Sequence, residues 1–324
     1  MPLTITFIGN HAPPHSTESD LRHTLEGMGH RVHSFQENAR GSSWSEILPV
    51  ALKSDMLLWV KTWSSLEAGG LAALRQLKEA GIPTAAIHLD LYHGLNRETR
   101  LRTDPWFKCE FVFTADGGSD DKWPQFGINH FWLPPGILES SCYLGAQDPK
   151  YTHDVVFVGS QGYHPEWPHR TDLIRFLRKN FGKRLGKYGN PERTMRGDDL
   201  NRLYNSSKVV IGDTLCLDGH RSYTSDRLTE SLGRAAFLIY PHIEGLESLG
   251  YEEGVHYIPY TYHDFAGLKK LIEHWLKPEQ DEARERIRMA GFQRTKECNT
   301  YRHRMLEVFD ILGETYPKFQ EHVA

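Results

Sequence analysis

An apolar segment that ends in glycine occurs twice in this chain, once at the N-terminus and again near the middle. The first copy is TITFIG, residues 4–9, and the second is DVVFVG, residues 154–159. Each copy is followed by segments that alternate between strand and helix patterns, which is typical of parallel strand pairing. Because both halves begin the same pattern, we expect an α/β fold with two doubly wound parallel sheets.

The expected elements fill both halves of the chain. In the first half we expect strands at 4–9, 30–35, 55–60, 83–89 and 110–114 and helices at 16–29, 43–53 and 66–80. In the second half we expect strands at 154–159, 184–188, 208–212, 236–240 and 255–260 and helices at 170–181, 198–206, 263–276, 281–297 and 301–315. A Pro-Pro-Gly stop at 134–136 and a polar stretch at 140–150 separate the halves. We therefore expect one domain over residues 1–140 and another over 151–300.

The composition supports two packed cores and excludes several classes of protein. Hydrophobic residues make up 39% of the 324, but no run approaches the ~20 apolar residues that a bilayer span needs. The N-terminal residues lack the basic flank of a secretory signal. The four cysteines are widely spaced and form no C-x-x-C pair, which is typical of reduced thiols. We expect a cytoplasmic protein without a disulfide framework or a metal site.

Neither half carries the glycine fingerprint of nicotinamide or flavin enzymes. After the first glycine-ending strand the chain reads Gly-Asn-His-Ala-Pro-Pro, residues 9–14. After the second it reads Gly-Ser-Gln-Gly-Tyr, residues 159–163. Both lack the G-x-G-x-x-G spacing that brings a dinucleotide pyrophosphate against a helix. The two sheets are therefore expected to bind a different kind of ligand.

The segment SDRLTESLGRAAFLIY, residues 225–240, predicts a short helix that leads into a buried strand. Arg227 and Glu230 are three residues apart, so they share one face of that helix. A cation at a helix N-terminus suits a phosphate, and a carboxylate suits a ribose diol. An exposed i,i+3 ion pair is the alternative interpretation of the same two residues.

Several motifs of the second half resemble, in order, the nucleotide-binding domain of GT-B glycosyltransferases, especially the branch named after the spore-maturation protein CgeB. They are DVVFVGS (154–160), an arginine that opens the next helix (170), KYGN (187–190), LNRLYNSSKVVIG (200–212), the 225–240 segment, GLESLGYEEGVHYIPY (245–260) and YRHRMLEVFDIL (301–312). The resemblance implies a GT-B fold, in which two Rossmann-like domains face each other across a cleft. It also implies that the last helix, within 301–324, packs back on the first domain.

The resemblance further implies a nucleotide-sugar donor, such as a UDP-sugar, that is bound by the second domain without a metal cofactor. Its donor-binding positions fall here on Gly159 and Ser160, Arg170, Tyr188 and Gly189, Arg227 and Glu230. Arg227 would approach the pyrophosphate, Glu230 the ribose, and Tyr188-Gly189 the nucleobase. Many retaining relatives carry a second glutamate eight positions before the ribose-binding one, where this chain has Ser222. The branch nevertheless implies retention of the anomeric configuration.

Candidate catalytic residues lie at the end of the fourth strand of the first half. His88 and Asp90 are two residues apart and would point the same way from a strand, with His93 close behind. Asp90 could orient an imidazole or act as a base, and His93 could meet the acceptor or a phosphate. His11 and His15 follow the first strand and are candidate acceptor-binding residues. Strand termination and helix capping are the alternative roles for these polar side chains.

The distribution of Lys and Arg along the chain suggests what kind of acceptor the protein uses. The net charge is −4, yet residues 170–196 contain nine Lys or Arg and two acids. With Arg97, Arg100, Arg102 and Lys108, this segment suggests DNA carrying a hydroxymethylated base as the acceptor. A solvated helix face is the alternative for the basic segment. A polysaccharide, a protein hydroxyl or a small metabolite remain alternative acceptors, and a sugar-nucleotide epimerase or a non-catalytic sensor remain alternative functions.

Overall fold

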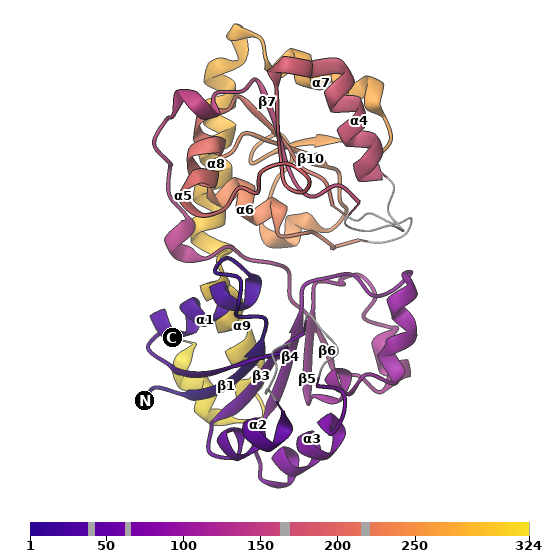
Figure 1. The fold of residues 1–324 in the computed structure, drawn as a ribbon, viewed down its shortest axis with the longest axis vertical. Coiled ribbons are helices and arrows are strands. Elements are labelled where there is room, and N and C mark those ends of the chain that lie inside the picture. Colours follow the sequence, from indigo (N-terminus) through magenta and orange to yellow (C-terminus); the bar gives the residue numbers. More distant parts are fainter. Residues whose placement is uncertain (38–42, 62–65, 163–168, 215–220, 324) are drawn as a thin grey trace. The chain divides into compact units, whose positions relative to one another are not determined.

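The computed structural model describes residues 1–37, 43–61, 66–162, 169–214 and 221–323 and divides into two compact units (Figure 1). Unit 1 comprises Met1–Leu138 together with Tyr301–Ala324, and unit 2 comprises Glu139–Thr300. Each unit is built on its own parallel sheet. The α/β class with two doubly wound parallel sheets, expected from the two glycine-ending strands, is confirmed.

Unit 1 contains a six-stranded sheet in the order β2-β1-β3-β4-β5-β6, with all neighbours parallel. The strands are β1 Thr4–Gly9, β2 Arg31–Gln36, β3 Met56–Val60, β4 Thr84–His88, β5 Phe111–Thr114 and β6 His130–Trp132. The sequence pattern did not predict β6. This strand has three residues, all only half-buried, so it carries too little periodicity to be recognised.

In the described part of unit 1, four α-helices pack on the two faces of the sheet. They are α1 Thr17–Gly27, α2 Trp44–Ala51, α3 Gly70–Glu79 and α9 Tyr301–Gly313. The apolar side chains of α1 and α9 share one core cluster with alternate residues of β1 and β3. Those of α2 and α3 share a second cluster with the intervening strand residues. Strands buried on both faces explain the continuous apolar runs in the sequence.

The C-terminal helix α9 belongs to unit 1 although it follows unit 2 in the chain. The backbone N–H of Tyr301 donates to the carbonyl of Ile137 at 2.8 Å. The buried Arg304 side chain donates through Nε to the carbonyl of Pro134 at 2.9 Å. Met305 and Phe309 are fully buried in the same core cluster as β1. These contacts attach the first turn of α9 to the Pro-Pro segment of unit 1 and to the residues that follow it.

Unit 2 contains a five-stranded parallel sheet in the order β11-β10-β9-β7-β8. Its strands are β7 Val155–Val158, β8 Leu185–Tyr188, β9 Val209–Ile211, β10 Leu238–Pro241 and β11 Ile258–Tyr260. Its α-helices are α4 His169–Phe181, α5 Gly197–Ser206, α6 Arg227–Gly233, α7 Phe265–Trp275 and α8 Asp281–Cys298. Side chains of α4, α7 and α8 close a core over β7, β9, β10 and β11.

Short 3-10 helices connect these elements in both units. They are η1 Asn96–Arg102, η2 Pro105–Lys108, η3 Trp123–Phe126, η4 Glu139–Ser141, η5 Pro149–Tyr151, η6 Gly182–Arg184, η7 Leu246–Leu249, η8 Pro278–Gln280 and η9 Pro317–His322. The strand expected at 255–260 is shorter, because Val255 is 40% exposed in a turn and β11 starts only at Ile258. No helix within the described ranges is long and apolar enough to cross a membrane.

Candidate active site

Three loops meet at the carboxyl edge of the unit 2 sheet. Val158 at the end of β7 pairs with Tyr188 at the end of β8, and Phe157 pairs with Ile211 of β9. Parallel pairing therefore brings the residues after these strands to one edge, which is where open α/β sheets bind ligands. Gly159, Gly189 and Asp213 follow the three strands at that edge.

Two glycines allow the first two loops to pack backbone against backbone. The N–H of Gly159 donates to the carbonyl of Tyr188 at 2.9 Å. Gly189 has φ +98°, and a Cβ there would lie 2.6 Å from the carbonyl carbon of Gly159. A Cβ on Gly159 would in turn lie 3.3 Å from the guanidinium of Arg227. Gly189 therefore requires glycine, whereas a side chain at Gly159 would crowd Arg227.

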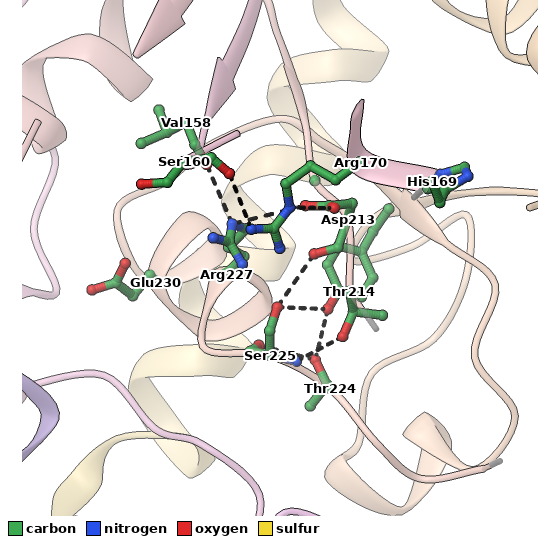
Figure 2. A network of polar contacts seen from close by, with 12 residues as sticks. Val158, Ser160, His169, Arg170, Asp213, Thr214, Thr224, Ser225, Arg227 and Glu230 are labelled. Atoms are coloured by element: carbon green, nitrogen blue, oxygen red, sulfur yellow. Dashed lines mark hydrogen bonds and ion pairs between the residues drawn. The ribbon is translucent and has the colours of Figure 1, made fainter. Parts of the chain in front are cut away.

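Arg170 and Arg227 converge on this loop from two helices, as Figure 2 shows. Arg170, in the first turn of α4, donates through Nη1 to the carbonyl of Ser160 at 3.4 Å. Arg227, the first residue of α6, donates through Nε to the carbonyl of Val158 at 3.3 Å. The Arg227 side chain remains 21% exposed, whereas that of Arg170 is 6% exposed.

Asp213 faces both arginines and is fully buried. Its Oδ2 accepts a hydrogen bond from Arg170 Nε at 2.7 Å, and its Oδ1 lies 3.9 Å from Arg227 Nε. Burial acts to raise the pKa of Asp213, but the two guanidinium groups outweigh it and the pKa is lowered. Burial acts to lower the pKa of Arg227, and Asp213 reverses this, so the pKa is raised. Both shifts favour the charged forms of Asp213 and Arg227.

Hydroxyl groups fix the segment that enters α6. The N–H of Ser225 donates to Thr214 Oγ1 at 3.0 Å, and Ser225 Oγ donates to the carbonyl of Asp213 at 3.3 Å. Thr224 Oγ1 and the hydroxyl of Tyr240 lie 2.9 Å apart in a buried hydrogen bond. The start of α6 is thereby tied to the ends of β9 and β10, which holds Arg227 at the glycine loop.

Glu230 lies one turn further along α6 and apart from the arginine network (Figure 2). Its side chain is 20% exposed, and its carboxylate lies 3.9 Å from both Arg196 and Arg234. Burial, with Asp226, raises the pKa of Glu230. Between the described side chains of Arg227 and Glu230 there is no ion pair, so the alternative of an exposed i,i+3 salt bridge is wrong.

The remaining donor-side candidates flank the glycine loop. The Tyr188 hydroxyl hydrogen-bonds His153 Nε2 at 2.9 Å, and partial burial raises its pKa. Ser160 contributes its carbonyl to Arg170. All seven candidates thus belong to a strand end, to loops or to the first turn of a helix at the same edge of one sheet: Gly159, Ser160, Arg170, Tyr188, Gly189, Arg227 and Glu230.

The catalytic candidates of unit 1 lie at the end of β4. His88 Nε2 is 3.6 Å from Asp90 Oδ2, and Arg97 donates to the same oxygen at 3.0 Å. His88 Nδ1 lies 2.7 Å from the carbonyl of Lys61, so Nδ1 carries the proton and donates. Burial lowers the pKa of His88, which keeps the ring neutral. The structure thus brings His88 and Asp90 together, with the unprotonated Nε2 of His88 facing Asp90.

His93 is separated from that pair. Its ring is buried, with 1% exposed, and packs edge-on against Trp123 at a centroid distance of 4.6 Å. The backbone N–H groups of Tyr92 and His93 donate to the buried carboxylate of Asp116 at 2.8 Å each. The chain turn after β4 is therefore anchored by β5, and the His93 ring lies in the aromatic core of unit 1.

The two acceptor-side candidates differ in burial. His11 packs edge-on against Phe7 at 4.7 Å, and its Nε2 lies 3.4 Å from the carbonyl of Phe7. Burial lowers the pKa of His11 to about 4, so this ring is neutral at physiological pH. His15 is exposed in the loop before α1.

The basic segment of unit 2 is largely paired with carboxylates. Arg175 pairs with Asp172, Arg178 and Lys187 with Glu192, Arg184 with Asp154, Arg193 with Asp199 and Arg196 with Glu230. Several of these acids lie outside the segment in sequence, so the count of charges along the chain overstated the local positive potential. Ion pairing on a solvated surface accounts for most of these cations.

Sequence reasoning missed Asp213 and the buried pair formed by Lys61 and Asp104. Asp213 directly follows the apolar run Val209–Ile211 and a glycine, so a polar residue at a strand's carboxyl end was the available signal. Lys61 follows β3 in the same way, and its Nζ pairs with the carboxylate of Asp104. Burial lowers the pKa of Lys61 to about 8. Among the described residues, no group of three or more His, Cys, Asp or Glu could hold a metal ion.

Comparisons with known proteins show which folds resemble that of this chain. Solved structures of similar fold include HepE from Anabaena in complex with UDP-glucose, which is 13% identical, covers 96% of this chain and 100% of that chain, and has a TM-score of 0.66. Sucrose-phosphate synthase from Thermosynechococcus elongatus is 11% identical over 98% of this chain and 100% of that one, with a TM-score of 0.63. BGT of phage T4 in complex with UDP-glucose is 12% identical over 96% and 99%, with a TM-score of 0.58.

These full-length similarities, with both parallel sheets, confirm the GT-B fold that the sequence motifs implied. Among curated proteins no match was found. A family described as glycosyl transferase-like matches residues 149–310, which is half of the chain and covers the sheet that carries Arg227, Asp213 and the glycine loop. The chain therefore belongs to the glycosyl transferase-like family.

Proposed function

We propose that this protein transfers a sugar from a UDP-sugar to a hydroxyl group of an acceptor, with unit 2 binding the donor. The observation that carries the proposal is the pair of ionised arginines at the Gly159 loop, inside the family-matched residues. Arginine provides a planar set of N–H donors that suits phosphate oxygens. Two proteins of similar fold, HepE and BGT, were solved in complex with UDP-glucose, which supports UDP as the nucleotide.

Each part of the donor has a proposed partner. The diphosphate contacts Arg227 and the backbone of Gly159 and Ser160, with Arg170 behind this loop. Glu230, at 20% exposure, accepts hydrogen bonds from the ribose hydroxyls. The uracil lies beside Tyr188 and Gly189. This assignment follows the CgeB-like resemblance, and we propose that the chain belongs to that branch.

Sugar transfer needs stabilisation of the negative charge that develops on the leaving UDP. Fixed guanidinium groups supply this without reorganisation, so we propose metal-independent transfer. Retention of configuration follows from the resemblance, with a donor phosphate oxygen helping to remove the acceptor proton. If a protein base takes part, His88 with Asp90 is the candidate pair, because the neutral ring presents an unprotonated Nε2. His93, His11 and His15 remain candidate acceptor-side residues.

For the acceptor we propose a hydroxymethylated base in DNA as the first compound to test. Its support is the density of Lys and Arg at 170–196 and at Arg97, Arg100, Arg102 and Lys108. The ion pairs described above reduce that support, so polysaccharide, protein and small-metabolite hydroxyls belong in the same screen. DNA binding predicts a fall of about 0.9 log unit in affinity per log unit of salt for each phosphate contacted. Binding that does not change with salt would exclude DNA.

One assay distinguishes a sugar transferase from the two alternatives, a sugar-nucleotide epimerase and a non-catalytic sensor. Purified protein is incubated with UDP-glucose, UDP-galactose or UDP-N-acetylglucosamine, with and without acceptors, and followed by NMR. Release of UDP with a new glycosidic product supports a transferase. Conversion of the sugar without acceptor or UDP release would identify an epimerase, and binding without turnover would identify a sensor. Absence of any UDP-sugar binding would contradict the proposal.

A further inference from the structure

A single carboxylate organises both arginines of the candidate site. Asp213 follows β9, is fully buried, and directs each oxygen at a different guanidinium: Oδ2 to Arg170 at 2.7 Å and Oδ1 to Arg227 at 3.9 Å. The arginines come from α4 and α6, which are far apart in the sequence. Asp213 therefore links two helix starts to one strand end (Figure 2).

Each arginine is also tied to the backbone beside Gly159. Arg227 donates to the carbonyl of Val158, and Arg170 donates to the carbonyl of Ser160, on either side of the glycine. The Arg170 guanidinium is thus held at two nitrogens, Nε by Asp213 and Nη1 by the loop. Arg227 is held at Nε, which donates to Val158 and lies 3.9 Å from Asp213 Oδ1, and this inward-facing Nε leaves the two terminal nitrogens of its planar guanidinium available to a ligand.

The charges of this trio leave a surplus of one cation. Two guanidinium groups that approach the same loop repel each other unless an anion lies between them, and a buried carboxylate needs cationic partners. Asp213 satisfies both requirements, and its pKa is lowered by both arginines. Arg227 is the more exposed of the two, at 21%, so the surplus charge is available at the loop.

We propose that Asp213 is a positioning residue for sugar transfer: it holds Arg227 in the orientation that binds the donor diphosphate and, through Arg170, fixes the Gly159-Ser160 loop. This inference rests on the proposed function. Because Asp213 itself has no exposed surface, it acts through the arginines and does not contact the donor.

The test uses the full chain with Asp213→Asn, which keeps the shape of the side chain and removes its charge. UDP and uridine affinities are measured by calorimetry, and kcat and KM with a UDP-sugar. Loss of an orienting partner costs about 10- to 100-fold in affinity or activity. We expect UDP affinity to fall by that factor while uridine affinity is unchanged. If Asp213 acted only through its charge, the opposite result would be expected. The site without that negative charge is more positive and would bind UDP more tightly.

The matched control is Asp154→Asn. Asp154 also bridges two cations, Arg184 at 2.6 Å and Lys208 at 2.9 Å, but it precedes β7 and so lies at the opposite edge of the same sheet. The ratio of UDP to uridine affinity should not change in this variant. An unchanged or increased ratio in Asp213→Asn would overturn the inference, whereas failure of the wild type to bind UDP would overturn the proposed function instead.

Removing a buried charge can prevent folding, so a second comparison is needed. Arg170→Gln and the double variant Arg170→Gln with Asp213→Asn differ only in the Asp213 charge, and the double variant leaves no buried carboxylate facing a missing cation. We expect the double variant to bind UDP at least tenfold more weakly than Arg170→Gln, since Arg227 has lost its partner. Equal UDP affinities in the two variants would contradict a positioning role.

Discussion

Gly159 and Gly189 lie so close that a single methyl group on Gly189 would be 2.6 Å from the carbonyl carbon of Gly159. The contact joins the loops after β7 and β8, and the far side of Gly159 faces the guanidinium of Arg227 at 3.3 Å from its Cβ position. The glycine pair therefore sets how near the backbone can come to Arg227, and through it to a bound phosphate.

Gly189→Ala is expected to destabilise unit 2 by about 1–3 kcal/mol, because φ +98° strains any residue with a Cβ and the methyl group meets backbone. It should also weaken UDP-sugar binding by displacing the Gly159 loop. Chemical denaturation and calorimetry measure the two effects. Gly182→Ala is the control, since Gly182 also has positive φ but has open space around its Cβ position. Full UDP-sugar affinity in Gly189→Ala would remove this loop from the site.

Arg227→Lys keeps the charge but loses the Nε hydrogen bond to Val158 and the planar donor set. Hydrogen bonds to charged groups contribute about 1.5–3 kcal/mol, so kcat/KM for the UDP-sugar should fall about 10- to 100-fold. Steady-state kinetics with UDP release as the readout measures the change. Arg178→Lys, at an exposed arginine paired with Glu192, should leave kcat/KM unchanged. Equal losses in both variants would point to a general effect of surface charge.

Glu230→Ala is expected to abolish the thermal stabilisation of the protein by UDP while the melting temperature without ligand stays near that of the wild type. The reason is that the ion contacts of Glu230 with the described residues are two long ones, at 3.9 Å, which contribute little to folding. Comparing UDP with 2′-deoxy-UDP isolates the ribose contact. The wild type should prefer UDP, and Glu230→Ala should not distinguish the two. A retained preference would assign the ribose to another residue.

The stability of unit 1 should decrease as the pH falls below neutral. Burial lowers the pKa of His130 to about 3, and this ring stacks on Trp123 at 4.0 Å. An unfolded histidine has a pKa of about 6.5, so between about pH 6.5 and pH 3 the unfolded state binds more protons and folding loses stability. His130→Gln should flatten this slope in denaturation curves followed by tryptophan fluorescence. The same slope in the variant would place the proton uptake elsewhere, for example at His11.

The fold was largely predictable because most of its strands are continuous apolar runs, and one such run that ends in glycine opens each sheet pattern. Such runs define parallel strands buried on both faces, and the second copy of the pattern indicated the second sheet. The edge strand β6 escaped prediction because its three half-buried residues carry no such pattern. The buried strands could therefore be predicted from the sequence, whereas an edge strand such as β6 depends on pairing with its neighbour.

The site was only partly predictable. The residue pattern predicted only that Arg227 opens a helix, whereas the family resemblance implied that Arg227 and the Gly159-Ser160 loop face the same phosphates, and the structure brings them together. Asp213 could not be assigned, since its partner Arg170 lies 43 residues away and only folding brings them together. The burial of His93 against Trp123 is equally non-local. Motifs thus identify positions at a sheet edge, and tertiary contacts decide which side chains bind a ligand and which pack.

A crystal structure of the protein with UDP would show whether Arg227 and the Gly159 loop bind the donor. We expect the diphosphate to lie within hydrogen-bonding distance of Arg227 and the backbone of Gly159-Ser160, with the ribose at Glu230 and the uracil beside Tyr188. Ordered UDP whose phosphates contact neither Arg227 nor the Gly159 loop would contradict this expectation.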